Sequence, residues 1–294
     1  MTRITEQYKA EVAGNLIKAL ERGCALWQKE WSCDFIPGLP VNAVTGKYYR
    51  GRSSIILWYE AEKLSSNEDD LRWATNRQAE SKGWSIKPGS RPVRISIMII
   101  PKKEDDEKKQ AIINTFNVFH ASQIQGIPKL MKRKVKRVMR NKEIEKIIVN
   151  SSARIFEGGF EPAYSPKDDL ITIPPKSAFD GTEGYYSNLL HELAHWTGHH
   201  SRLFRFYSWN LANKVEHARE ELVAEIASMF LSAAVGIPQT QEHFTNHAAY
   251  ISSWISLLRS DPEEIFRAAR EASKATDFIL KFGEESKIED KKVV

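Results

Sequence analysis

The sequence predicts an α+β protein made of two domains. The chain has 294 residues, which is long for one small domain and fits two of ordinary size. Alternating apolar residues predict an antiparallel sheet with flanking helices in the first half, whereas helical periodicity dominates the second half. Residues 1–150 carry 28 Lys and Arg against 17 Asp and Glu, and residues 151–294 carry 15 against 21. We therefore expect a basic first domain and an acidic second domain.

The first half is expected to be an α+β domain at residues 1–130. Apolar residues at helical spacing indicate helices, and glycines and prolines mark the turns between elements. Two runs of alternating and apolar residues indicate strands of one antiparallel sheet. The expected elements are helices at residues 5–23, 54–64 and 72–83 and strands at residues 91–100 and 114–124.

Residues 131–150 are expected to be a basic linker or helix between the domains. Six of the ten residues from Met131 to Arg140 are Lys or Arg. The second domain, residues 151–284, is predicted to be mostly helical with a small sheet, and residues 285–294 form a charged tail. Its expected elements are strands at residues 153–158 and 169–175 and helices at residues 185–198, 217–235, 242–259 and 262–282.

Several protein classes are excluded by composition. No apolar stretch is long enough to span a bilayer, and the N-terminal residues have no apolar core typical of a signal peptide. Cys24 and Cys33 are the only cysteines, which are too few for a disulfide framework or an all-cysteine zinc site. A reducing cytoplasm is the expected location.

The segment His191-Glu192-Leu193-Ala194-His195 predicts a metal site. Residues four apart lie on one helix face, so His191 and His195 can bind one ion. Glu192 is placed to take a proton from a water whose pKa the metal lowers, and is therefore the candidate catalytic residue. Apolar neighbours indicate a buried helix, where two histidines and a glutamate need partners. We expect one Zn²⁺ per chain.

A third ligand must come from elsewhere in the chain. The pattern HExxHxxGxxH has Gly198 in place, but its last position is Ser201, which argues against that scheme. The alternative is a glutamate from the apolar helix around residues 217–231, which offers Glu220, Glu221 and Glu225. We predict Glu221 as the ligand and Glu225 as the carboxylate that orients a histidine. Glu220 is interpreted as a solvated residue.

The first half also has the composition of a single-strand DNA binder, in which cations follow the backbone and aromatic rings stack on bases. The segment TGKYYRGR is the best contact candidate, because glycines flank it and its charges cannot all be buried. The charge alone equally fits a solvated surface. The predicted contact residues are Trp27, Trp31, Lys47, Tyr48, Tyr49, Arg50, Arg52 and Arg77.

Over nearly its whole length the chain resembles the ArdC-type antirestriction proteins of plasmids and phages. The resemblance is carried by PVNAVTGKYYRGRSSIILW and FNVFHASQIQGIP in the first half, and by YYSNLLHELAHWTGHHSRL and REELVAEIASMFL in the second. It implies an N-terminal single-stranded DNA-binding domain and a C-terminal zincin-like metallopeptidase domain. It also implies His191 and His195 as metal ligands, Glu192 as the catalytic glutamate, and a ligand from the EELVAE segment.

The expected function is that of an antirestriction protein that binds single-stranded DNA and hydrolyses peptide bonds. Its expected partners are single-stranded DNA and an unknown protein substrate such as a restriction component, with no membrane. One alternative is a protein that shields single-stranded DNA without catalysis and has a structural or vestigial metal site. A metal-dependent nuclease is the last alternative, because two-metal nucleases need clustered bridging carboxylates.

Overall fold

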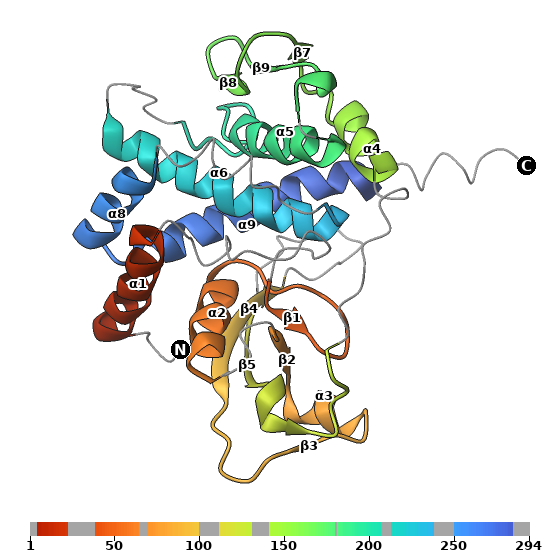
Figure 1. Ribbon diagram of the computed structural model, residues 1–294, viewed down its shortest axis with the longest axis vertical. Helices are drawn as coiled ribbons and strands as arrows, with labels where there is room; N and C mark the ends of the chain where they lie inside the picture. The colour runs from red at the N-terminus through yellow and green to blue at the C-terminus, as the bar shows by residue number, and fades with distance from the viewer. Residues whose placement is uncertain are drawn as a thin grey trace, which may run out of the picture. The chain divides into compact units, whose positions relative to one another are not determined.

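The computed structural model describes residues 5–22, 39–64, 70–99, 112–130, 141–179, 181–206, 213–237 and 250–284 (Figure 1). Its mixture of long helices and small sheets confirms the α+β prediction. The chain divides into two compact units. One contains Met1–Pro37 and Lys132–Val294, and the other contains Gly38–Met131. None of the described helices has the length and apolar character needed to cross a membrane.

The Gly38–Met131 unit is built on a four-stranded sheet in the order β1-β2-β5-β4. The parallel pair β1–β2 is followed by β5, which runs antiparallel to both β2 and β4. Helix α2 contributes Leu57 and Ala61 to a core with Trp73, Ile95 and Val118. The main strands are β1 (Val41–Asn42), β2 (Arg72–Ala74), β4 (Val93–Ile99) and β5 (Ile112–His120). The remaining elements are α2 (Arg52–Leu64), α3 (Asn76–Glu80), η1 (Ala121–Gln123) and the pair β3 (Ser85–Ile86) with β6 (Ile124–Gln125).

The helix expected at residues 72–83 is wrong in its first turn, where the chain forms strand β2. Trp73 is fully buried and pairs with His120 of β5. The helix begins only after Thr75, whose hydroxyl accepts a hydrogen bond from the Gln78 N–H. Oε1 of Gln78 in turn accepts a hydrogen bond from the Thr75 N–H, which completes a capping box. The capping box at Thr75 therefore marks the true start of the helix, three residues after the predicted start at residue 72.

The other unit is mostly helical, with α6 at its centre. Almost every residue of α6 from Glu220 onward is buried, because α5, α8 and α9 all pack against it. A three-stranded sheet has β9 in the middle, parallel to β7 and antiparallel to the edge strand β8. Its helices are α1 (Glu6–Glu21), α4 (Asn141–Ser151), α5 (Thr182–Trp196), α6 (Lys214–Val235), α8 (Ile251–Ser260) and α9 (Glu264–Glu284), with η3 (Lys176–Ala178). Its strands are β7 (Ile155–Glu157), β8 (Ala163–Ser165) and β9 (Leu170–Ile173).

Two segments from outside the predicted second domain belong to this unit. Helix α1 packs on α8, and Lys9 forms an ion pair of 2.9 Å with Glu263. Residues 141–150, expected in a basic linker or helix, lie in helix α4, which packs on α9. Residues 131–140 and the tail at 285–294 lie outside the described residues. The short strand β8 was not predicted, because its three residues are too few for a pattern of alternation.

Candidate metal centre

Helix α5 brings the two histidines of the HELAH segment together. The helix is buried on all sides from Gly184 onward, so its polar residues cannot turn to solvent. His191 and His195 lie one turn apart, and their Nε2 atoms are 3.1 Å from each other. Their residues are only 2% and 6% exposed. Two imidazoles that converge in this way can bind the same metal ion.

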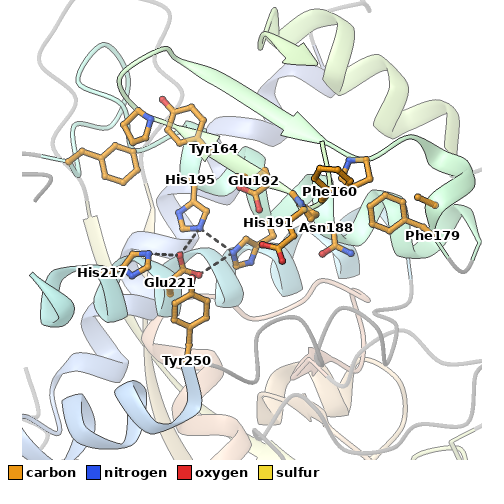
Figure 2. Close-up of a pocket in the computed structure, with 17 residues that line it drawn as sticks. Phe160, Tyr164, Phe179, Asn188, His191, Glu192, His195, His217, Glu221 and Tyr250 are labelled. Atoms are coloured by element: carbon orange, nitrogen blue, oxygen red, sulfur yellow. Dashed lines mark hydrogen bonds and ion pairs between the residues drawn. The ribbon is translucent and has the colours of Figure 1, made fainter. Parts of the chain in front are cut away.

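Glu221 of α6 supplies the third converging group. Its Oε2 lies 3.5 Å from Nε2 of His191, and its Oε1 lies 3.5 Å from Nε2 of His195. One donor atom from each of the three residues lies within 4.8 Å of the other two. Figure 2 shows this triangle, with Glu192 beside the two histidines. Of the three glutamates considered from the sequence, Glu221 is therefore the one that faces both histidines.

The outer nitrogens of the histidines face two further glutamates. Nδ1 of His191 lies 3.5 Å from Oε2 of Glu225, which is fully buried. Nδ1 of His195 lies 3.3 Å from Oε1 of Glu220. Carboxylates in such positions fix the orientation of a metal-binding imidazole. The nearby arginines Arg202 and Arg219 pair with Asp169 and Glu264.

The interpretation of Glu220 as a solvated residue is wrong. Glu220 is only 7% exposed, and Arg205 binds both of its oxygens at 2.7 and 3.0 Å. Arg205 also donates to the Ala194 carbonyl and the Thr197 hydroxyl, so it ties α6 to the end of α5. The apolar residues on every side of α6 were the signal that Glu220 had to be buried. Arg205 lies after α5 and offers no periodic signal in the sequence.

Gly198 is explained by close packing. A Cβ atom at this position would lie 2.8 Å from Cζ of Phe206 and 3.0 Å from the His195 carbonyl oxygen. The backbone of residues 205 and 206 also donates to the Gly198 carbonyl. Ser201, at the last position of the HExxHxxGxxH scheme, contacts His199 at 2.8 Å. The glycine therefore lets the returning chain bring Arg205 to Glu220.

Negative charge exceeds positive charge at this site. Glu192, Glu220, Glu221 and Glu225 surround the two histidines, and Arg205 neutralises Glu220 alone. Burial by itself would lower the pKa of both histidines. Hydrogen bonds to Glu221 and Glu225 instead raise the pKa of His191 to about 9. The Glu221 charge and a hydrogen bond to Glu220 raise that of His195 to about 10.

The lowered pKa of Glu221 likewise indicates that positive charge stabilises this site. Burial would raise it, but the adjacent histidines hold it well below its usual range. A divalent cation would supply the missing positive charge. Two imidazole nitrogens and one carboxylate are also the donor set of many catalytic zinc sites. The residues present therefore fit a divalent metal ion.

The three converging residues line a cavity of about 450 Å³ together with Glu192. His217, one turn before Glu221, places its Nε2 3.3 Å from Oε1 of Glu221. The Tyr250 ring packs edge-on against His217 at 5.4 Å. Burial, followed by the charges of Glu221 and Glu192, raises the pKa of Tyr250 to about 12, so its hydroxyl stays protonated. Asn188, Tyr250 and the aromatic residues Phe160, Tyr164, Phe179 and Phe206 also line this cavity and were not predicted (Figure 2).

Other histidines and tyrosines near the motif have structural partners. His199 contacts Ser201, and its ring packs on that of His200 at 4.0 Å. The Tyr185 hydroxyl donates to Glu157 at 2.9 Å, and that of Tyr186 donates to Glu145. Both tyrosines are only 3% exposed, so these contacts give them a packing role.

The predicted DNA contacts fall into three groups. Trp27 and Trp31 lie outside the described residues. Lys47 and Arg77 are exposed, whereas Tyr48, Arg50 and Arg52 are half-buried. Tyr49 is only 8% exposed, and its hydroxyl accepts a hydrogen bond from Asn42. Tyr49 and Arg77, which are far apart in sequence, line one hollow of the Gly38–Met131 unit.

Comparison with known families matches both halves of the chain. Residues 6–136 match the N-terminal domain of anti-restriction factor ArdC, and residues 142–271 match a zincin-like metallopeptidase domain. The first match includes helix α1, which the spatial contacts group with the second half.

Similar proteins are found among primases and antirestriction proteins. Two Escherichia coli proteins named DNA primase TraC are each 35% identical over 96% and 92% of this chain, which spans only 28% and 20% of their length. A crystal structure of metal-free ArdC from plasmid R388 is 31% identical. It matches with a TM-score of 0.70 over 94% of this chain and 98% of that one. The Mn(II)-bound structure of that protein matches with a TM-score of 0.69. The chain therefore belongs to the ArdC family of antirestriction proteins.

Proposed function

We propose that this chain binds single-stranded DNA through its first domain and hydrolyses peptide bonds at a zinc ion held by His191, His195 and Glu221. The observation that carries the catalytic part is the convergence of these three side chains in a cavity that also contains Glu192. Antirestriction would then combine contact with incoming DNA and cleavage of a protein that acts on it, such as a restriction component.

Zinc is the proposed metal because of the donor set. Imidazole suits zinc, whereas manganese prefers carboxylate, carbonyl and water ligands. When bound, the ion would lower the pKa of a water molecule and polarise the substrate carbonyl. Glu192 would take the proton of the attacking water and deliver it to the leaving amine. Glu220 and Glu225 would hold the imidazoles in place, and the Tyr250 hydroxyl would donate to the developing oxyanion.

A peptide substrate is supported by the strand beside the site. Ala163 and Tyr164 of β8 line the cavity, and β8 is the edge strand of its sheet. Within the described residues, the outer side of β8 has no strand partner. An extended peptide can add to such an edge through main-chain hydrogen bonds. This would place its scissile bond near the three donors.

The DNA-binding part rests on the exposed and half-buried basic residues of the first domain. The loop from Thr45 to Arg52 begins with a turn held by Asn42, whose Oδ1 accepts from the N–H groups of Val44 and Thr45. This turn exposes Lys47 while Tyr49 stays buried. Cationic loops of this kind contact phosphates without reading sequence.

The test of catalysis is Glu192→Gln. The variant should keep stoichiometric metal, measured by mass spectrometry of the purified protein. It should lose about 10²- to 10⁴-fold in peptide hydrolysis, because it lacks the general base. Glu183→Gln, in the first turn of the same helix, is the matched control and should keep full activity. Unchanged turnover in Glu192→Gln would contradict the proposed mechanism.

A second candidate is a protein that shields single-stranded DNA without catalysis. It is favoured by the burial of the three converging residues, because His191, His195 and Glu221 are only 2%, 6% and 6% exposed. A metal ion enclosed by protein is typical of a structural site. If Glu192→Gln protects unmodified plasmid DNA in restricting cells as well as the wild type does, this second function gains support over the first.

A further inference from the structure

A hollow of about 690 Å³ in the Gly38–Met131 unit lies on the sheet between strand β4 and helix α3. Cavities of this size are typical of small-ligand sites. It is separate from the metal centre, and all its lining residues belong to this unit. The residues that matter for its chemistry are Asn42, Tyr49, Arg77, Gln78, Ile97 and Phe116.

One wall of the hollow is fixed by Asn42. Its Nδ2 donates to the Tyr49 hydroxyl oxygen at 3.1 Å and to Oε1 of Gln78 at 3.0 Å. Oε1 of Gln78 also accepts from the Thr75 N–H at 2.9 Å. Asn42, Tyr49 and Gln78 come from three segments of the chain, and these bonds hold them in one arrangement. The wall is therefore preorganised for a ligand.

Two donors of this wall remain unused within the described part of the chain. The Tyr49 oxygen accepts from Asn42, but its own hydrogen has no acceptor there, although Tyr49 is only 8% exposed. Burial raises the pKa of Tyr49, so the hydroxyl keeps this hydrogen. Nε2 of Gln78 likewise has no acceptor among the described residues. Tyr49 and the half-buried Gln78 both line the hollow, so a ligand with acceptor atoms could accept both hydrogens there.

The floor of the hollow is apolar and partly open. Ile95 and Phe116 are paired across β4 and β5, so they share one face of the sheet. Phe116 is half-buried, and Ile97, two residues beyond Ile95, is 36% exposed. Arg77 of α3 is exposed, and its guanidinium has no ion pair or hydrogen bond with any described residue. An apolar platform thus lies beside two donors and one cation.

We propose that this hollow binds one unstacked nucleobase of a single DNA strand. Phe116 and Ile97 would contact the face of the base, Tyr49 and Gln78 would donate to its acceptor atoms, and Arg77 would pair with the adjacent phosphate. The proposal rests on the DNA binding proposed above. A nucleotide is favoured over a peptide segment because its flat apolar face, acceptor edge and linked anion match all three features.

The test compares a short single-stranded oligonucleotide with one of equal length that has abasic sites throughout. Affinity of the full chain is measured by fluorescence anisotropy. The wild type should bind the intact strand more tightly. Phe116→Leu, which keeps apolar volume but removes the ring, should lose about 5- to 100-fold for the intact strand, the range expected for one stacked base. It should lose little for the abasic strand. Tyr49→Phe should lose about 2- to 10-fold with the same selectivity.

Arg91→Gln is the matched control for Arg77→Gln, because Arg91 is exposed in the same unit but does not line the hollow. Arg77→Gln should weaken binding of both strands more than Arg91→Gln does. If Phe116→Leu and Tyr49→Phe weaken intact and abasic strands equally, the base-binding proposal is overturned while DNA binding stands. If the wild type binds neither strand, DNA binding itself fails. Circular dichroism of each variant separates these results from unfolding.

Discussion

At the candidate metal centre, Nδ1 of each histidine faces a carboxylate. Arg205 donates to both oxygens of one of these carboxylates, that of Glu220. In the hollow of the Gly38–Met131 unit, the Tyr49 hydroxyl and Nε2 of Gln78 keep hydrogens without acceptors among the described residues. The first arrangement suits a point charge at a fixed position. The second suits a ligand that varies along a polymer. The two sites therefore differ in whether their polar groups already have partners within the described part of the protein.

The largest effect is expected when the two histidines that would bind the metal ion are replaced. His191→Ala/His195→Ala should lose essentially all of the roughly one metal ion per chain expected for a single site. The reason is that Glu221 alone cannot replace two nitrogens. Metal content of the purified variant, measured beside the wild type, checks this. His199→Ala/His200→Ala is the control, since these neighbours lie outside the cluster. Metal retained by the first variant would exclude the proposed site.

Arg205→Met should be the next largest effect. It leaves the buried Glu220 without its cation, and breaking a buried pair in this way costs about 3–5 kcal/mol of unfolding free energy. Denaturant unfolding checks it. Arg259→Met is the control, because Arg259 is 63% exposed in its pair with Glu21. That change should cost under about 1 kcal/mol. Equal losses of unfolding free energy in the two variants would show that the buried Arg205–Glu220 pair stabilises the protein no more than an exposed pair does.

A smaller effect is expected at the proposed DNA-binding surface. Lys47→Gln should reduce the slope of log affinity against log salt by about 0.7, the contribution of one phosphate contact on a single strand. Titrations of an oligonucleotide at several salt concentrations measure this slope. The metal content should not change, because Lys47 lies in the other unit. An unchanged slope would remove Lys47 from the contact surface.

The smallest effect is expected at Asp169, which accepts from Tyr164 at 2.8 Å and pairs with Arg202. Burial would raise the pKa of Asp169, but these partners lower it below its usual value. A lowered folded-state pKa stabilises the protein above the unfolded value of about 4, and this contribution is lost as pH falls through the folded value. Asp169→Asn should therefore cost up to about 1 kcal/mol at neutral pH and nothing in strong acid.

Thermal unfolding as a function of pH measures this difference. Asp168→Asn is the neighbouring control, whose carboxylate contacts only Ser165 among the described residues. A difference between Asp169→Asn and the wild type that persists at the lowest pH would show that packing, not charge, explains the effect.

The sequence predicted the convergence of His191, His195 and Glu221 further than the shape of the hollow, for a physical reason. His191 and His195 are related by one helical turn, and Glu221 lies on a second helix with its own short motif, so local periodicity was enough. Glu220 was misjudged because its partner Arg205 comes from a loop, which has no period. The hollow depends on Asn42, Gln78 and Phe116, which only the sheet brings together. The first turn of the helix predicted at residues 72–83 is a strand instead, because burial of Trp73 in the sheet outweighed helical spacing.

The packing of α1 on α8 has a consequence for synthesis of the chain. Arg259 of α8 pairs with Glu21 of α1 across 238 residues of sequence. At a ribosomal rate of about 5–20 residues per second, α1 waits roughly 10–50 s for this partner. During that interval its apolar face, which includes Val12, Leu16 and Leu20, lacks its native cover. The Gly38–Met131 unit has all its own strands by then and can fold first. Nascent α1 is therefore the segment that a chaperone would be expected to hold until α8 emerges.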